Sequence, residues 1–223
     1  MRTYQSTMPS YLTPLNLIPT VTERTNRGER AYDIYSMLLN NRIIFVGSPI
    51  ENQFANVIIA QLLYLDGESS NLPIQMYISS PGGEVHAGLG IYDAMQQTKA
   101  PITTIAVGST HSFGTVLLTA GQPGRRFAME NAVIHMHQPL IAGNGISGQV
   151  SDIHIHAQQL VRVRRRVEEI MTTHTGKALE QIERDMDRDF YLDAQEAKAY
   201  GLVDEVLTNT EHVPEQQVSE MIK

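Results

Sequence analysis

Residues Pro101–Gly121 read PITTIAVGSTHSFGTVLLTAG, and this stretch decides the fold. A β-branched apolar run that starts at Ile102 breaks at Gly108, and after four small or polar residues an apolar run resumes at Phe113. The pattern predicts a buried strand, a tight turn and a buried helix. Ser112 falls in the turn, where a helix N-terminus offers unpaired N–H groups and the positive end of a dipole. Ser112 is therefore a candidate nucleophile, although serine is also a common helix-capping residue.

The same alternation of strand and helix continues on both sides of this stretch. Strands are predicted at 42–46, 73–78, 102–107, 126–129, 132–136 and 202–206. Helices are predicted at 31–40, 51–66, 85–98, 113–120, 149–175, 178–187 and 194–200, and a mobile segment or hairpin at 16–30. Strands and helices that alternate at this spacing predict right-handed βαβ crossovers and a mostly parallel sheet. The predicted fold class is therefore α/β.

Unusual residues follow three of the predicted strands. They are Ser-Ser-Pro-Gly-Gly at 79–83, the turn at 108–114, and His-Met-His-Gln-Pro at 135–139. Ligands gather at the carboxyl ends of parallel strands, so these segments can line one site. The Gly82-Gly83 pair lets the backbone approach a ligand closely. Of the eight histidines, His137 is the best placed to act as a base.

Two assignments stay open when only residue spacing is used. A metal site is an alternative for the histidines, because His135 and His137 share one face of a strand. His154 and His156 lie in a helical pattern, where residues i and i+2 point apart, so a third zinc ligand is missing and no metal site is predicted. The acidic partner of a histidine base cannot be chosen by spacing, because the segment 183–192 holds three alternating aspartates: Asp185, Asp187 and Asp189.

Composition narrows the function classes. The chain of 223 residues predicts one main domain, and its net charge of −7 argues against nucleic acid as a partner. No apolar run approaches the roughly 20 residues that span a bilayer. The absence of cysteine excludes thiol nucleophiles and fits a cytoplasmic protein. The segment 1–15 lacks the features of a secretory or transit peptide, and we expect a propeptide or a disordered tail.

Several blocks of the sequence, in one order, resemble the proteolytic subunit of the Clp protease (ClpP), a serine peptidase, over nearly all of residues 17–207. They include YISSPGGEVHAGLGIYDAMQ, GSTHSFGTVLLTAG, NAVIHMHQPL and HTGKALEQIERDMDRDFYLDAQEA. The resemblance implies Ser112 as the nucleophile, His137 as the base and Asp189 as the acid. It also implies that the backbone N–H groups of Gly83 and Phe113 bind the oxyanion, and that the chain needs no cofactor or metal.

The resemblance also implies an architecture. The expected fold is the ClpP/crotonase-like spiral of βαβ units, with a helical handle that protrudes after the loop 143–148. Residues 16–30 correspond to an axial loop, residues 31–208 to a single peptidase domain, and residues 209–223 to a disordered tail. The expected assembly is a homo- or hetero-oligomer of two stacked heptameric rings, with the arginines of 162–166 at the ring–ring contact.

Implied partners are unfolded proteins and an AAA+ unfoldase such as ClpX, ClpA or ClpC, which hydrolyses the ATP. Tyr77 is expected to help form the clefts in which the unfoldase docks.

The nucleophile turn departs from the family pattern. The family usually has Ala-Ala-Ser-Met-Gly where this chain has Thr-His-Ser-Phe-Gly at 110–114. The bulky His111 and Phe113 suggest a reshaped specificity pocket or a subunit suited to mixed rings. A non-catalytic or paralogue-dependent ring subunit is therefore one alternative, and a crotonase-type acyl-CoA enzyme is another. An α/β-hydrolase is disfavoured, because Thr110 replaces the first glycine of the Gly-x-Ser-x-Gly elbow.

Overall fold

The computed structural model describes residues 18–25, 28–141 and 145–208. The predicted tails at 1–15 and 209–223, and part of the predicted glycine-rich loop at 143–148, lie outside the described residues. The chain forms two compact units, Met1–Asn41 and Arg42–Lys223. The predicted boundaries of the axial segment and of the peptidase domain stay predictions.

The first unit contains a hairpin and a short helix. Strands β1 (Thr20–Thr25) and β2 (Gly28–Asp33) pair antiparallel, with Thr20 opposite Asp33, and helix α1 (Ile34–Asn40) follows. The helix predicted from residue 31 begins later, because the Asp33 side chain caps it by accepting a 2.9 Å hydrogen bond from the Ser36 N–H. Residues 31–33 are therefore strand, which corrects the predicted start of this helix.

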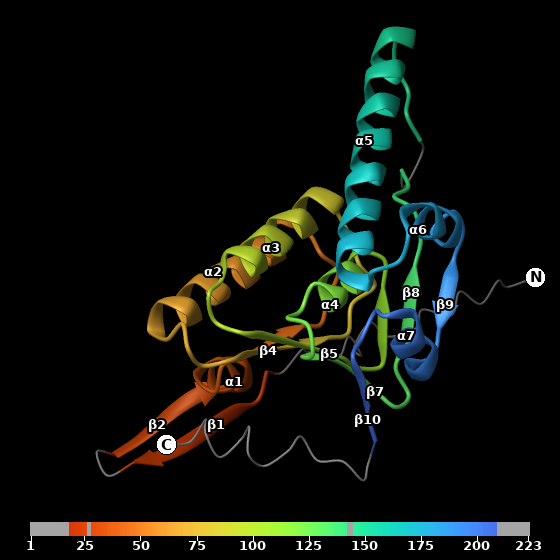
Figure 1. The fold of residues 1–223 in the computed structure, drawn as a ribbon. Coiled ribbons are helices and arrows are strands. Elements are labelled where there is room, and N and C mark those ends of the chain that lie inside the picture. Colours follow the sequence, from red (N-terminus) through yellow and green to blue (C-terminus); the bar gives the residue numbers. More distant parts are fainter. Residues whose placement is uncertain (1–17, 26–27, 142–144, 209–223) are drawn as a thin grey trace, which may run out of the picture. The chain divides into compact units, whose positions relative to one another are not determined.

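A parallel sheet forms the centre of the second unit (Figure 1). Its strands are β3 (Ile43–Val46), β4 (Ile74–Ile78), β5 (Ile102–Ala106), β7 (Arg126–Met129) and β10 (Glu205–Leu207), in the order β10-β7-β5-β4-β3. Every neighbouring pair is parallel, which confirms the predicted sheet. The last strand begins at Glu205 and not at residue 202.

Three helices connect the strands of this sheet. They are α2 (Asn52–Glu68), α3 (Val85–Gln97) and α4 (Phe113–Thr119). Helices α2 and α3 lie side by side over one face of the sheet (Figure 1). The alternate residues Ile74, Met76 and Ile78 of β4 are fully buried, so the core lies between the sheet and these helices.

A second, three-stranded sheet was predicted only in part. It contains β6 (Ser109–His111), β8 (Val133–Met136) and β9 (Phe190–Leu192), in the order β6-β8-β9. The sequence pattern predicts β8, but it places the residues of β6 in the turn before Ser112 and does not predict β9. Both missing strands have three residues, too few to show an alternating pattern, and pairing with β8 holds them extended.

Helices α5 (Val150–Thr175), α6 (Leu179–Asp185) and α7 (Ala194–Tyr200) complete the second unit. The N-terminal half of α5 projects away from the other elements of this unit (Figure 1), and the buried residues of the helix begin only at Val163. This projecting helix agrees with the expected handle. It ends at Gly176, which adopts the left-handed conformation at φ 69°.

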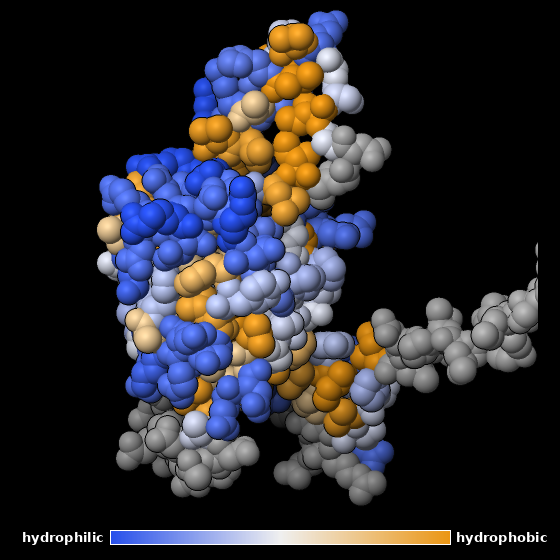
Figure 2. Space-filling model, turned by 90° about the vertical axis from the view of Figure 1, so that its right-hand side faces the viewer, coloured by the Kyte–Doolittle hydropathy of each residue, from blue (hydrophilic) through white to orange (hydrophobic). Residues whose placement is uncertain are grey.

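Apolar side chains gather on the projecting half of α5 (Figure 2). The exposed ones include Val150, Ile153, Ile155 and Val161. A contiguous apolar surface of this kind marks an interaction site. None of the helices in the described residues is both long enough and apolar enough to span a membrane.

Candidate active site

Ser112 occupies a strained turn between β6 and α4. Its backbone lies at φ 53° and ψ −123°, a conformation that residues other than glycine rarely adopt. Its N–H donates a 3.0 Å hydrogen bond to the His135 carbonyl of β8, which helps to hold the turn. The hydroxyl makes no capping hydrogen bond to α4. The side chain is therefore not used as a helix cap, and strain of this kind is typical of functional residues.

The Gly82-Gly83 segment packs directly against this turn. Hydrogen bonds of 2.8 Å from the Ile50 N–H to the Gly82 carbonyl, and from the Glu84 N–H to the Ile50 carbonyl, fix the segment. A Cβ atom on Gly82 would lie 2.6 Å from Cβ of Ser112 and 3.0 Å from the Phe113 nitrogen. Only glycine permits this approach.

The two predicted oxyanion donors lie in this region of close contact. Within the described part of the chain, the N–H groups of Gly83 and Phe113 have no hydrogen-bond partner. Two unpaired N–H groups beside a serine can receive a negative oxygen that forms on a bound substrate.

A small cavity joins Ser112 to His137. Its lining comes from helices α3, α4 and α5, the turn before α4, the end of β8 and the segments after β8 and α6: Val85, Ser112, Phe113, Val116, Met136, His137, Pro139, Val167, Met171 and Met186. All of these side chains are apolar except those of Ser112 and His137. Phe113, whose bulk suggested a reshaped pocket, is 3% exposed and lines the cavity.

Asp189 is the predicted acid, and its carboxylate lies beside two histidines. Oxygen Oδ1 is 3.1 Å from Nε2 of His135 and 4.0 Å from Nδ1 of His137. The other two alternating aspartates have different partners. Asp185 accepts a 2.7 Å hydrogen bond from the Tyr200 hydroxyl, and Asp187 accepts one from the Gln138 side chain. Among the described residues, the hydroxyl of Ser112 has no hydrogen bond to His137.

The structure adds an aromatic cluster that the sequence did not predict. The His135 ring stacks on Tyr191 at a centroid distance of 4.3 Å, and its centroid lies 5.1 Å from those of both His111 and His137. Strand pairing causes this arrangement, because His135 lies opposite His111 on β6 and opposite Tyr191 on β9. The alternation of His135 and His137 can be seen in the sequence. Their contacts with His111 and Tyr191 cannot, because they depend on the pairing of β6 and β9 with β8. Across the described residues, no group of three side chains is arranged to hold a metal ion.

Burial decides the charge of His135. Removal from water lowers the pKa of this imidazole below its ordinary value, in opposition to the hydrogen bond with Asp189, which raises it. Burial has the larger effect, so His135 is neutral near pH 7.

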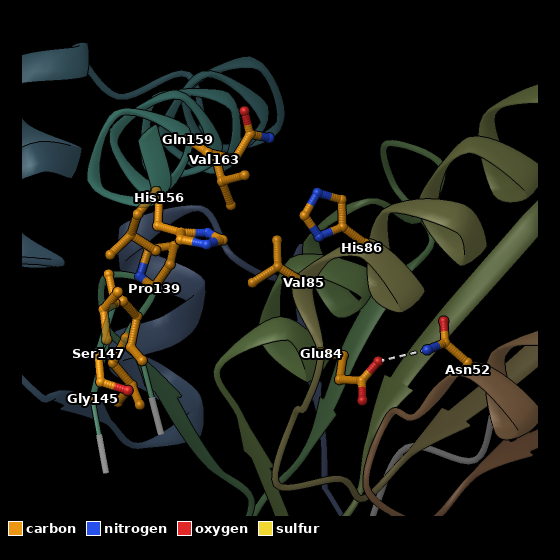
Figure 3. A pocket seen from close by; sticks show the side chains of 14 residues that line it. Asn52, Glu84, Val85, His86, Pro139, Gly145, Ser147, His156, Gln159 and Val163 are labelled. Atoms are coloured by element: carbon orange, nitrogen blue, oxygen red, sulfur yellow. Dashed lines mark hydrogen bonds between the residues drawn. The ribbon is translucent and has the colours of Figure 1, made fainter. Parts of the chain in front are cut away.

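A larger cleft adjoins the small cavity (Figure 3). It has a volume of about 760 Å³ and lies between the start of α3 and helix α5. Val85 and Pro139 line both spaces, so the cleft leads to Ser112. At one end of the cleft, Glu84 accepts a 2.8 Å hydrogen bond from Asn52 (Figure 3).

Comparison with known proteins identifies the family of this chain. The Clp protease family model matches residues 26–210. The chain therefore belongs to the Clp protease family, whose members are serine peptidases. It is 51% identical over 191 residues to "ATP-dependent Clp protease proteolytic subunit 1" of Salinibacter ruber (strain DSM 13855 / M31). The aligned residues make up 86% of this chain and 81% of the relative.

Proposed function

We propose that this chain cleaves peptide bonds with Ser112 as the nucleophile, His137 as the general base and Asp189 as the orienting acid. One observation carries the proposal: a strained, uncapped serine and a histidine share one apolar cavity, and a carboxylate lies beside Nδ1 of that histidine. The 4.0 Å separation between Asp189 and His137 is beyond hydrogen-bond distance. Catalytic hydrogen bonds of this kind often tighten only when substrate binds.

The position of Asp189 determines which nitrogen of His137 acts as the base. Because Nδ1 of His137 faces the carboxylate, Nε2 remains to take the Ser112 proton. The Oγ atom attacks the scissile carbonyl carbon, and His137 later gives the proton to the leaving amine, which breaks the C–N bond. Water, which gives a proton to His137, then attacks the carbonyl carbon of the Ser112 ester. The bond between this carbon and Oγ breaks, the acid product leaves, and His137 returns the proton to Oγ. Asp189 holds the imidazole tautomer and stabilises the imidazolium.

The tetrahedral oxyanion binds to the N–H groups of Gly83 and Phe113 in this mechanism. Each such donor contributes roughly 3–4 kcal/mol in comparable sites. The contribution depends on rigid placement, which the close packing of Gly82 on Ser112 supports.

The substrate is an extended, unfolded polypeptide. The small cavity has a volume of only about 20 Å³ in this structure. Its valine, methionine and phenylalanine lining favours an apolar substrate side chain, which enters when substrate binding widens the cavity. The larger cleft takes the chain on one side of the scissile bond, since it adjoins the cavity at Val85 and Pro139.

The family and the surface support a ring assembly with an ATP-driven partner. The chain forms two stacked heptameric rings, in which the exposed apolar residues of α5 bury their surface against the opposite ring (Figure 2). Arg164 and Arg165 also bind glutamates of their own chain, at 2.6 Å and 3.0 Å. An AAA+ unfoldase, of the kind named above, docks near the half-buried Tyr77 and delivers unfolded protein in the cytoplasm.

Fluorophosphonate labelling tests the assignment of the nucleophile. A probe that reacts with activated serines is expected to modify Ser112, as located by peptide mass spectrometry, and the modification is expected to require His137. Labelling that persists at full rate in the His137→Ala chain would contradict the assigned base. Absence of labelling in an assembled ring would favour a non-catalytic subunit or an acyl-CoA enzyme.

A further inference from the structure

Asp189 is held by a residue outside the proposed triad. Its side chain is 67% exposed, and its one hydrogen bond within the described residues is the 3.1 Å contact between Oδ1 and Nε2 of His135. An exposed carboxylate without an anchor samples several rotamers and so presents no fixed oxygen to a neighbouring imidazole.

His135 has the rigidity that an anchor needs. Its side chain is 8% exposed and lies on β8, the central strand of the second sheet. Tyr191 stacks on one side of the ring with an interplanar angle of 28°, and His111 packs nearby. The packing of the imidazole therefore holds its Nε2 atom toward the carboxylate, and the ring does not have to change its conformation to bind Asp189.

The neutral state of His135 suits this role. Nε2 faces a carboxylate and therefore carries the proton, while Nδ1 is buried without a partner in the described residues. A neutral donor holds the carboxylate but leaves its negative charge available. The same Oδ1 atom can then accept a second hydrogen bond from Nδ1 of His137, now 4.0 Å away. The titratable groups that face His135 are His111, His137, Asp189 and Tyr191.

We propose that His135 is a positioning residue for peptide cleavage, whose Nε2–H group anchors the Asp189 carboxylate beside His137. The proposal rests on the proposed function, because it assigns His135 to the same triad. His135 touches neither substrate nor the reacting atoms and acts only through Asp189.

A matched pair of variants tests the proposal in the assembled full chain. Methionine and glutamine have side chains of similar length, but only glutamine offers an N–H donor. In hydrolysis of a fluorogenic peptide, His135→Met is expected to lower kcat about tenfold or more with KM unchanged, a loss of the size seen when the hydrogen-bond partner of a metal ligand is removed. His135→Gln is expected to restore most of the lost kcat. Equal kcat in the two variants would overturn the proposal.

A double-mutant cycle separates positioning from a structural role. In an Asp189→Ala background, His135→Met is expected to cause no further loss of kcat, because the residue it anchors is gone. A tenfold further loss would overturn the proposal. If the His135→Met chain does not assemble, His135→Leu replaces it in both comparisons. An Asp189→Ala chain with unchanged kcat would instead contradict the proposed triad, so the two failures are distinguishable.

Discussion

An alanine at Gly88 is expected to damage the active site from outside it. Gly88 lies on α3 against the Phe113 ring, and an added Cβ would lie 2.2 Å from Cδ1 and 2.5 Å from Cε1 of that ring. Carbon atoms without a bond attract one another only near 3.5–4.0 Å, so the ring must move. Phe113 is 3% exposed and has little free space, so its movement shifts the backbone N–H that we propose as an oxyanion donor.

Two opposing effects determine how much Gly88→Ala changes the stability of the fold. Overpacking a buried site costs about 1–3 kcal/mol, whereas alanine gains about 1 kcal/mol over glycine inside a helix. Gly88→Ala is therefore expected to destabilise the fold by about 0–2 kcal/mol. Removal of an oxyanion donor lowers kcat about 10²–10³-fold. A displaced donor is expected to cost about tenfold or more on the same scale.

Gly90 on the same helix provides the matched control. A Cβ atom there would lie 3.4 Å from Cδ1 of Ile59, at the edge of ordinary contact. Gly90→Ala should keep kcat and hold or raise the melting temperature. The assay measures melting and peptide hydrolysis for both variants. Restoration of stability by Phe113→Leu in the Gly88→Ala chain would support the clash, and a Gly88→Ala chain that behaves like Gly90→Ala would refute the reasoning.

Three further predictions concern the acid, a buried ion pair and pH. Asp189→Asn should lower kcat by up to about 10⁴-fold, as loss of the triad acid does elsewhere; unchanged kcat would remove Asp189 from the triad. Arg164→Met leaves the 2% exposed Glu168 unpaired and should cost about 3–5 kcal/mol. Arg165→Met breaks two exposed pairs, with Glu169 and Glu183, and should cost at most about 1 kcal/mol for each; equal melting temperatures would contradict this difference. Burial, and then the charge of Arg126, lower the pKa of His174, so protonation favours the unfolded state and the melting temperature should fall as pH drops below about 6.5. The fall between pH 7 and 5 should be smaller in His174→Gln, and an identical fall would exclude His174 as its source.

The sequence predicted the parallel sheet because long apolar runs determine it. Strand β5 and helix α4 follow from the periodicity of Pro101–Gly121, and their observed ends differ from the predicted ones by one residue. Strands β6 and β9 were missed for a physical reason. Each is three residues long, and contacts with β8, not local preference, hold them extended.

The sequence likewise predicts some parts of the candidate site and not others. Residue chemistry pointed to Ser112 and His137, and the structure places both on one cavity. The choice among three aspartates required the resemblance, because alternate spacing is equal for all of them. His135 was considered only as a metal ligand, since its contact with Asp189 depends on β9 pairing with β8. The serine conformation was also invisible in the sequence, because packing against Gly82 fixes it.

Hydrolysis of short fluorogenic peptides tests the central claim most directly. The purified chain and a Ser112→Ala control are compared, with the mass of each measured in solution. Cleavage by a ring-sized assembly, lost in the control while the assembly mass stays the same, is the predicted result. Full cleavage by the Ser112→Ala assembly would contradict the assignment of the nucleophile, and no cleavage by an assembled wild-type ring would contradict the claim that this subunit is an active peptidase by itself.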